Sequence, residues 1–258
     1  MPAFATLDTV SFKTPDGRTL FDNLTLSFGA ERTGVVGRNG VGKTSLIRLL
    51  AGEAAPASGT VKVTGSIGVL TQALQPEPGA TVAEVLGLSE PLARLARIEA
   101  GEGTPEDLAE ADWLLPTRLE AALADVGLAG LSPGRPAAAL SGGQLTRAAL
   151  AGLLAAAPDL ILLDEPTNNL DAAGRALVAE VLGAWRGGAV VVSHDRGLLR
   201  RMDRIVELSS LGAKVYGGGY DLYAERKAAE EAAEAAAKAA AEAERQAAEG
   251  DGTVHGNT

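Results

Sequence analysis

Between a β-rich run at Thr33–Val36 and a helical stretch at Lys43–Leu50, the chain reads Gly37-Arg38-Asn39-Gly40-Val41-Gly42-Lys43-Thr44. This spacing fits the pattern G-x-x-x-x-G-K-[ST] in the strand-to-helix context that the pattern requires. Glycines let the backbone wrap closely around phosphate groups, and the N-terminus of the following helix adds the positive end of its dipole. Lys43 would place a positive charge near the outer phosphates, and the Thr44 hydroxyl would be a ligand for Mg²⁺. The sequence therefore predicts a phosphate-binding loop here.

A second element is the apolar run Leu160–Leu163, which ends in the carboxylates Asp164 and Glu165. A continuous apolar run of this length is typical of a buried strand in a parallel sheet. Ligands of such sheets bind beyond the carboxyl ends of the strands. Beside a phosphate-binding loop, Asp164 is expected to hold Mg²⁺ through water, and Glu165 to orient or deprotonate an attacking water.

The composition excludes several classes of protein. Of 258 residues, 46% are hydrophobic and 22% charged, which is ordinary globular composition and rules out wholesale disorder. The chain has no cysteine, so disulfides, thiolate metal sites and cysteine nucleophiles are excluded. Only His194 and His255 are histidines, which argues against a multi-histidine metal site. The formal net charge of −10 disfavours nucleic-acid binding over a broad face, although a local basic patch stays open.

The sequence also bears on location. No apolar run approaches the roughly 18–20 residues that span a bilayer. The N-terminus, MPAFATLDTV, lacks the basic start and apolar core of a signal peptide. We therefore expect a cytoplasmic protein without an intrinsic membrane span.

Four regions follow from the pattern of apolar periodicity and breakers. Residues 1–220 are predicted to form one α/β domain, with residues 73–139 as a helical subdomain carrying 11 acidic and 4 basic residues. Its candidate helices are Thr81–Leu86 and Pro105–Val126, the latter interrupted at Pro116. Residues 221–249 are rich in Ala and Glu without Gly or Pro, which predicts a solvated helix or the start of a linker. Residues 250–258 are expected to be a disordered tail.

A series of motifs, in family order, resembles those of ATP-binding cassette (ABC) ATPases. Besides the phosphate loop and the carboxylate strand, Leu140-Ser141-Gly142-Gly143-Gln144 resembles the family's LSGGQ signature. Glu165-Pro166-Thr167-Asn168-Asn169-Leu170-Asp171 contains a segment similar to the D-loop. Val192-Ser193-His194-Asp195-Arg196 resembles the switch-histidine loop, and Thr71-Gln72 matches the Q-loop. The resemblance covers residues 1–220 and implies a P-loop NTPase fold, an ABC-type nucleotide-binding domain with a helical subdomain.

The resemblance implies a role for each motif residue in Mg²⁺-dependent ATP hydrolysis. Glu165 would be the catalytic base, His194 would contact the γ-phosphate, and Gln72 would contact Mg²⁺ and the attacking water. The metal would be held by Thr44, Gln72 and Asp164. ATP would be bound by the loop residues Gly37, Arg38, Asn39, Gly40, Val41, Gly42, Lys43 and Thr44.

The same resemblance implies a second cassette as partner. In the family, the signature residues Ser141, Gly142, Gly143 and Gln144 close over the ATP bound to another cassette, and Asp171 lies at the same seam. A second helix N-terminus at Ser141 would face the triphosphate from the other side, so ATP would join the two halves and hydrolysis would release them.

Further details look like the ABC-F group, cassette proteins that act on ribosomes. Thr146-Arg147 follows the signature, Pro166–Asp171 resembles the form PTNxLD, and Ser193–Arg196 is similar to SHDR. Gly217–Tyr223 before a charged helix looks like the start of that group's interdomain linker. The group's linker is basic, whereas residues 221–249 hold 8 acidic and 4 basic residues. The charge of this segment therefore counts against RNA contact by this part of the chain.

Three functional alternatives stay open. The preferred one is an ABC-F-type ATPase that closes around ATP and acts on the ribosome. The others are the ATPase subunit of a membrane transporter, docked through residues 73–139, and a nucleotide-gated binding module that hydrolyses weakly. The sequence does not decide between a homodimeric half and the N-terminal half of a two-cassette protein.

The base-stacking residue is also open. The family places an aromatic residue upstream of the phosphate loop, where this chain has Thr14. Phe12, in a β-rich run, is either part of the core or the stacking residue.

Overall fold

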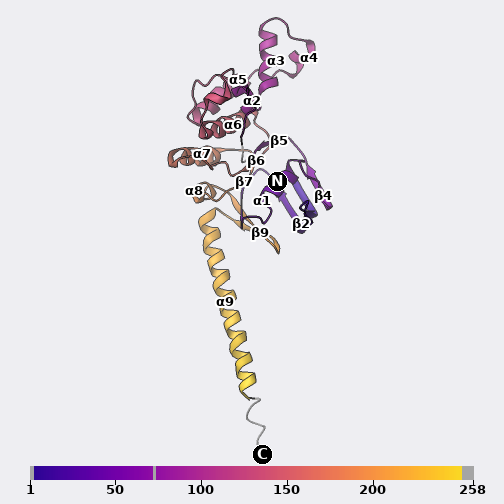
Figure 1. Cartoon of the computed structure of the whole chain (residues 1–258), viewed down its shortest axis with the longest axis vertical. Helices are drawn as coiled ribbons and strands as arrows, with labels where there is room; N and C mark the ends of the chain where they lie inside the picture. The colour runs from indigo at the N-terminus through magenta and orange to yellow at the C-terminus, as the bar shows by residue number, and fades with distance from the viewer. Residues whose placement is uncertain (1–2, 72–73, 252–258) are drawn as a thin grey trace, which may run out of the picture.

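The computed structural model describes residues 3–71 and 74–251. Figure 1 shows a body of strands and short helices from which the last helix extends, while α3 and α4 project at the opposite end. The strands are β1 (Ala5–Lys13), β2 (Thr19–Phe28), β3 (Arg32–Gly37), β4 (Ser58–Val63), β5 (Ile67–Leu70), β6 (Leu160–Asp164), β7 (Gly188–Val192), β8 (Arg204–Ser209) and β9 (Gly212–Gly217). The helices are α1 (Lys43–Leu50), α2 (Val82–Val85), α3 (Ser89–Glu99), α4 (Pro105–Glu110), α5 (Leu115–Asp125), the 3-10 helix η1 (Ala137–Ala139), α6 (Gly142–Ala156), α7 (Ala172–Ala184), α8 (Arg196–Leu199) and α9 (Tyr220–Asp251).

A six-stranded sheet organises the body, with the order β5-β6-β7-β3-β8-β9. Its strands are parallel except β9, which pairs antiparallel with β8. Val192 at the end of β7 pairs with Asp164 of β6 on one side and Val35 of β3 on the other. The register therefore brings the segments that follow β3, β6 and β7 to the same edge of the sheet, as expected for a parallel α/β fold.

The two faces of this sheet bury different layers. Along β6, Leu160 and Leu162 pack with α1 and the small sheet, whereas Ile161 and Leu163 pack with α6, α7 and the helical subdomain. Side chains alternate across a strand, so a continuous apolar run fills both layers at once. The small sheet is antiparallel, in the order β2-β1-β4, and covers α1. The sequence-based prediction of an α/β P-loop fold is confirmed.

The helical subdomain differs in detail from the predicted one. Its helices include α3, which the sequence analysis did not single out. The predicted helix Pro105–Val126 is two helices, α4 and α5, separated by residues 111–114 rather than interrupted at Pro116. Pro116 instead lies in the first turn of α5, where the N–H that proline lacks has no helical partner in any case. Arg97 of α3 hydrogen-bonds both carboxylate oxygens of Asp107 in α4 and ties the projecting pair together.

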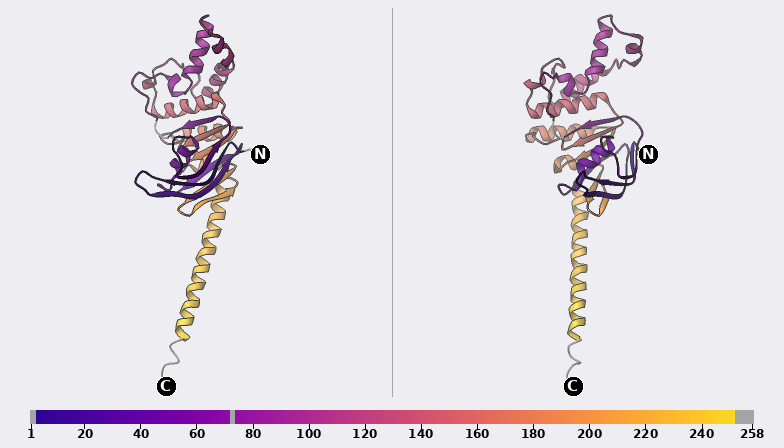
Figure 2. Two further views of the ribbon diagram at one scale, coloured as in Figure 1. Left: turned by 90° about the vertical axis from the view of Figure 1, so that its right-hand side faces the viewer. Right: turned by 45° about the vertical axis from the view of Figure 1, so that its right-hand side comes forward.

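Helix α9 is anchored only at its base. Lys227 and Tyr223 both contact the Glu207 carboxylate of β8, and Tyr216 of β9 donates a hydrogen bond to Glu230. Both views of Figure 2 show α9 running away from the body, and its residues from 228 to 246 are exposed. The helix covers the predicted stretch 221–249 and continues to Asp251. The remainder of the predicted tail, with His255, lies outside the described residues.

Among residues 3–71 and 74–251, no helix combines the length and the apolar character that crossing a bilayer requires.

Candidate active site

The loop between β3 and α1 needs glycine where the backbone is most crowded. Gly42 is the N-cap of α1 with φ of 114°, and a Cβ there would lie 2.8 Å from the Phe21 ring. A Cβ on Gly37 would lie 2.6 Å from the carbonyl oxygen of Leu208. Only glycine fits both positions without displacing a neighbour. The sequence thus fixes a loop that runs directly into the helix N-terminus.

Lys43 points back over this loop. Its Nζ donates hydrogen bonds to the carbonyl oxygens of Gly37, at 2.6 Å, and Arg38, at 3.1 Å. The side chain is mostly buried, and burial lowers the pKa of Lys43 against the opposing effect of the Glu165 and Asp164 carboxylates. The geometry therefore holds an ammonium group above the N-terminus of α1, where an anion would bind.

Thr44 and Asp164 form a pair of oxygen ligands. The Thr44 hydroxyl donates a 2.8 Å hydrogen bond to Asp164 Oδ2 across the gap between α1 and the end of β6. Hydroxyl and carboxylate oxygens are the ligands that Mg²⁺ prefers. The described residues contain no cluster of three or more His, Asp or Glu side chains that could enclose a metal. The donor set fits Mg²⁺, which Thr44 and Asp164 would hold together with water and phosphate oxygens.

Glu165 and His194 lie beside this pair. Glu165 Oε2 accepts a hydrogen bond from the His194 backbone N–H, and Glu165 Oε1 lies 3.3 Å from His194 Nε2. The Glu165 carboxyl is 9% exposed, and burial raises its pKa although the neighbouring His194 opposes the shift. Its backbone has φ of 51°, a left-handed conformation unusual for a residue with a side chain. A buried carboxyl with a raised pKa and a strained backbone is typical of a catalytic group.

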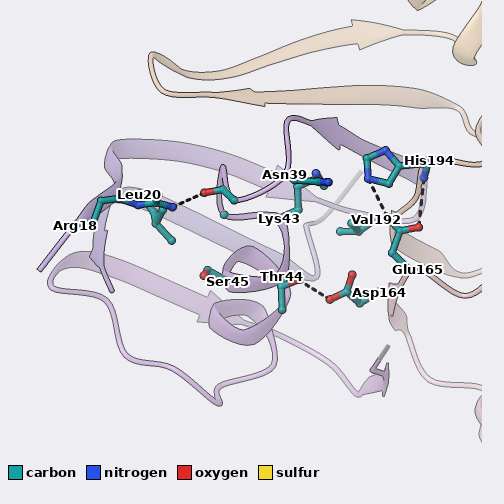
Figure 3. A pocket seen from close by; sticks show the side chains of 12 residues that line it. Arg18, Leu20, Asn39, Lys43, Thr44, Ser45, Asp164, Glu165, Val192 and His194 are labelled. Carbon is teal, nitrogen blue, oxygen red and sulfur yellow. Dashed lines mark hydrogen bonds and ion pairs between the residues drawn. The ribbon is translucent and has the colours of Figure 1, made fainter. Parts of the chain in front are cut away.

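These residues line one open pocket of about 450 Å³ (Figure 3). Of the predicted residues, the pocket brings together Asn39, Gly40, Gly42, Lys43, Thr44, Asp164, Glu165 and His194. Gly37, Arg38 and Val41 instead line a neighbouring pocket on the other side of the loop. Gln72 lies outside the described residues.

Neither candidate position for the residue that stacks on the nucleotide base lines the pocket. Phe12 packs against the core cluster of the small sheet, with its ring centroid 6.3 Å from that of Phe21, and neither it nor Thr14 lines the pocket. Arg18 and Leu20 line it instead, and Arg18 Nη2 donates a 2.6 Å hydrogen bond to the Gly40 carbonyl oxygen. Sequence reasoning missed both, because a single Arg and a single Leu after the turn Pro15-Asp16-Gly17 form no motif.

The signature residues occupy a different pocket. Ser141 caps α6, since its Oγ accepts from Gln144 N while Gln144 Oε1 accepts from Ser141 N. A pocket of about 420 Å³ is lined by Ser141, Gly142, Gly143, Arg147, Asn169, Leu170 and Asp171. It shares no residue with the pocket at Lys43. The side chain of Gln144 is folded back as a helix cap and does not line it.

Comparison with known proteins decides the family. A family model described as ABC transporter matches residues 21–168. The chain belongs to the ABC family. The tylosin resistance ATP-binding protein TlrC of Streptomyces fradiae is 37% identical to the cassette over 83% of the chain and 44% of its own length. The energy-dependent translational throttle protein EttA of Mycobacterium tuberculosis is 35% identical over 82% of the chain and 42% of its own length.

Other relatives of the cassette are transport proteins. The biotin transport ATP-binding protein BioM of Rhizobium etli is 33% identical over 73% of the chain and 83% of its own length. The solved dimeric structure of a bacterial ABC transporter cassette superposes with a TM-score of 0.66 at 22% identity, over 83% of this chain and 98% of that one. The ABC cassette described here therefore has the family fold, and it spans less than half the length of TlrC and EttA.

Proposed function

We propose that this chain is an ABC-F-type cassette that binds MgATP and hydrolyses it after closing against a second cassette. The observation that carries the proposal is the separation of two half-sites, since the signature residues and Lys43 line different pockets of one molecule. A nucleotide on the Lys43 side would therefore be fully enclosed only when another cassette supplies the signature side.

ATP binding would use the pocket from one end to the other. The triphosphate would lie on the loop and the α1 N-terminus, next to the Lys43 ammonium. Mg²⁺ held at Thr44 and Asp164, with Gln72 as the family implies, would neutralise charge on the outer phosphate oxygens. The adenine base would lie toward Leu20 and the Arg18 guanidinium. That guanidinium is held by its hydrogen bond to the Gly40 carbonyl oxygen.

Hydrolysis would use Glu165 as the base. A water oxygen attacks the γ-phosphorus, the bond to the bridging oxygen of ADP breaks, and the proton of the water passes to the Glu165 carboxylate. His194 holds that carboxylate through its backbone N–H and would reach the γ-phosphate with its exposed ring. The raised pKa of Glu165 strengthens it as a base.

Closure would place the other cassette's signature opposite the γ-phosphate. Helix α6 is 15 residues long and starts at the capped Ser141, so its N-terminus offers backbone N–H groups and the positive end of a dipole. The partner's Asp171 would lie at the same seam. Support comes from the dimeric cassette of similar fold.

The similarity to TlrC and EttA favours an ABC-F role in translation, in the cytoplasm, with the ribosome as a partner. The similarity to BioM favours a second candidate, the ATPase subunit of a transporter. Sedimentation of the MgATP-bound protein separately with ribosomes and with membranes distinguishes them, because each role predicts binding to one fraction only.

The direct test uses Glu165→Gln, which keeps the shape of the side chain but removes the base. With excess MgATP this variant should lose phosphate release and accumulate as dimers, measured by light scattering. The Lys43→Ala variant is the control and should stay monomeric because ATP no longer binds tightly. Undiminished turnover of Glu165→Gln would contradict the assignment of the base.

A further inference from the structure

A second pocket adjoins the active site on the far side of Glu165 and His194. It has a volume of about 640 Å³ and lies between the segment after β6, helix α7 and helix α8. Glu165 and His194 line both pockets, so the two volumes meet at these two side chains. Whatever leaves the γ-phosphate position on this side would enter the second pocket.

Three arginines line this pocket, which we call the arginine pocket: Arg175 of α7, Arg196 of α8 and Arg201 just beyond α8. All three are exposed, and none forms an ion pair within the described part of the chain. Nearby arginines behave differently, because Arg32 pairs with Asp203 and Arg200 with Asp221. Three uncompensated guanidinium groups around one pocket stand out in a chain of net charge −10.

Two of these arginines are positioned by contacts that leave the charge uncompensated. The side chain of Arg201 packs on α7, where a Cβ at Gly183 would lie 2.7 Å from its Cδ. The guanidinium of Arg196 lies 5.4 Å from the centre of the Tyr220 ring. Both groups therefore keep their hydrogen-bond donors for another partner.

The carboxylates of the pocket are already engaged. Asp195 Oδ1 accepts hydrogen bonds from the Gly197 and Leu198 backbone N–H groups as the cap of α8. Glu165 accepts from His194. Neither carboxylate forms an ion pair with the three arginines in the described residues, so their guanidinium groups are available for an anion, and the planar guanidinium group matches phosphate oxygens well.

We propose that the arginine pocket receives the inorganic phosphate produced by hydrolysis, a step that rests on the proposed function. After the bond to ADP breaks, ADP still covers the loop, and a second cassette covers the γ side. The orthophosphate anion passes His194 and moves from the active site to Arg175, Arg196 and Arg201, whose guanidinium groups donate hydrogen bonds to its oxygens. The pocket thereby makes product release directional.

The first test measures binding of orthophosphate to the ADP-loaded protein by phosphorus NMR. The second measures the inhibition constant of orthophosphate for ATP turnover. The double variant Arg175→Gln/Arg201→Gln should weaken phosphate binding about tenfold or more, since each charged hydrogen bond it removes is worth at least about a factor of ten. The KM for ATP should stay unchanged. The control Arg226→Gln removes an exposed arginine of α9 and should leave both the phosphate affinity and the KM for ATP unchanged.

Three outcomes would overturn the inference. One is unchanged phosphate binding in the double variant, and another is an equal rise in KM and in the phosphate inhibition constant, which would indicate a general charge effect. The third is that the double variant loses affinity for a short single-stranded RNA but keeps its affinity for orthophosphate. That result would make the arginine pocket a nucleic-acid site instead. The single variant Arg175→Gln, which changes an exposed side chain, keeps the test valid if the double variant unfolds. The proposed function is tested separately by the turnover of Glu165→Gln. The NMR measurement of phosphate binding needs no turnover, so the two proposals can fail independently.

Discussion

Glu165 carries an unusual combination of burial, left-handed backbone and contact with His194. A left-handed conformation costs about 1–3 kcal/mol for a residue with a side chain. The surrounding strands hold it there, because Glu165 N donates to the carbonyl oxygen of Val192 in β7. The carboxyl lines the pocket, where it accepts a hydrogen bond from the His194 backbone N–H.

The pH dependence of turnover should report this environment. A base acts only when deprotonated, and burial raises the pKa of Glu165. Turnover should therefore fall as pH decreases through a pKa above the usual value of about 4.3 for glutamate. Steady-state phosphate release measured from about pH 4 to 8 checks this, with the inactive variant Glu165→Gln as the background control. An acid limb at or below the usual glutamate value would contradict it.

Arg18 should affect the base end of the nucleotide and not its phosphates. A guanidinium plane stacks on any purine, so Arg18→Ala should weaken ATP and GTP binding by similar factors of about 2–30. Affinity for inorganic tripolyphosphate should stay the same. Calorimetry with the three ligands measures the difference, and Arg18→Tyr, which restores a stacking surface, should recover nucleotide affinity. An equal loss for tripolyphosphate would mean that Arg18 acts through the loop carbonyl of Gly40.

At the scale of the element, α6 and α4 offer a matched comparison. Ser141 and Thr104 each cap a helix through a reciprocal capping box. Ser141→Ala and Thr104→Ala should each lower the free energy of unfolding by about 1 kcal/mol, measured by urea denaturation. Only Ser141→Ala should also lower turnover, because the Ser141 hydroxyl would face the partner's γ-phosphate. Equal turnover of the two variants would remove Ser141 from the site.

The elements also show what sequence reasoning can reach. The strand β6 and the start of helix α6 were predictable, because a continuous apolar run and a serine cap are local signals. The division between α4 and α5 was not, since proline ends a helix and begins one with equal ease. Helix α3 was not predicted. It is held to α4 by ion pairs of Arg94 and Arg97 with residues of α4, and such pairs are visible only in the folded structure.

At the scale of the whole molecule, the motif order predicted that these residues gather at one edge of the sheet, and the register explains how they do so. Val192 pairs with both Val35 and Asp164, so residues far apart in sequence reach one edge. Arg18, Leu20 and the arginine pocket were beyond prediction, since they depend on how loops from different layers meet. The separation of the Lys43 pocket from the signature pocket is likewise a property of the folded chain.

That separation is tested most directly by mixing two inactive variants. Lys43→Ala removes the loop half-site, and Gly142→Asp places a negative charge in the signature half-site, where the structure leaves open space for a side chain. Each variant alone should be inactive, but an equal mixture should regain a substantial part of the wild-type phosphate release, because each mixed dimer contains one intact composite site. A mixture no more active than the average of its components would contradict a site shared between two cassettes.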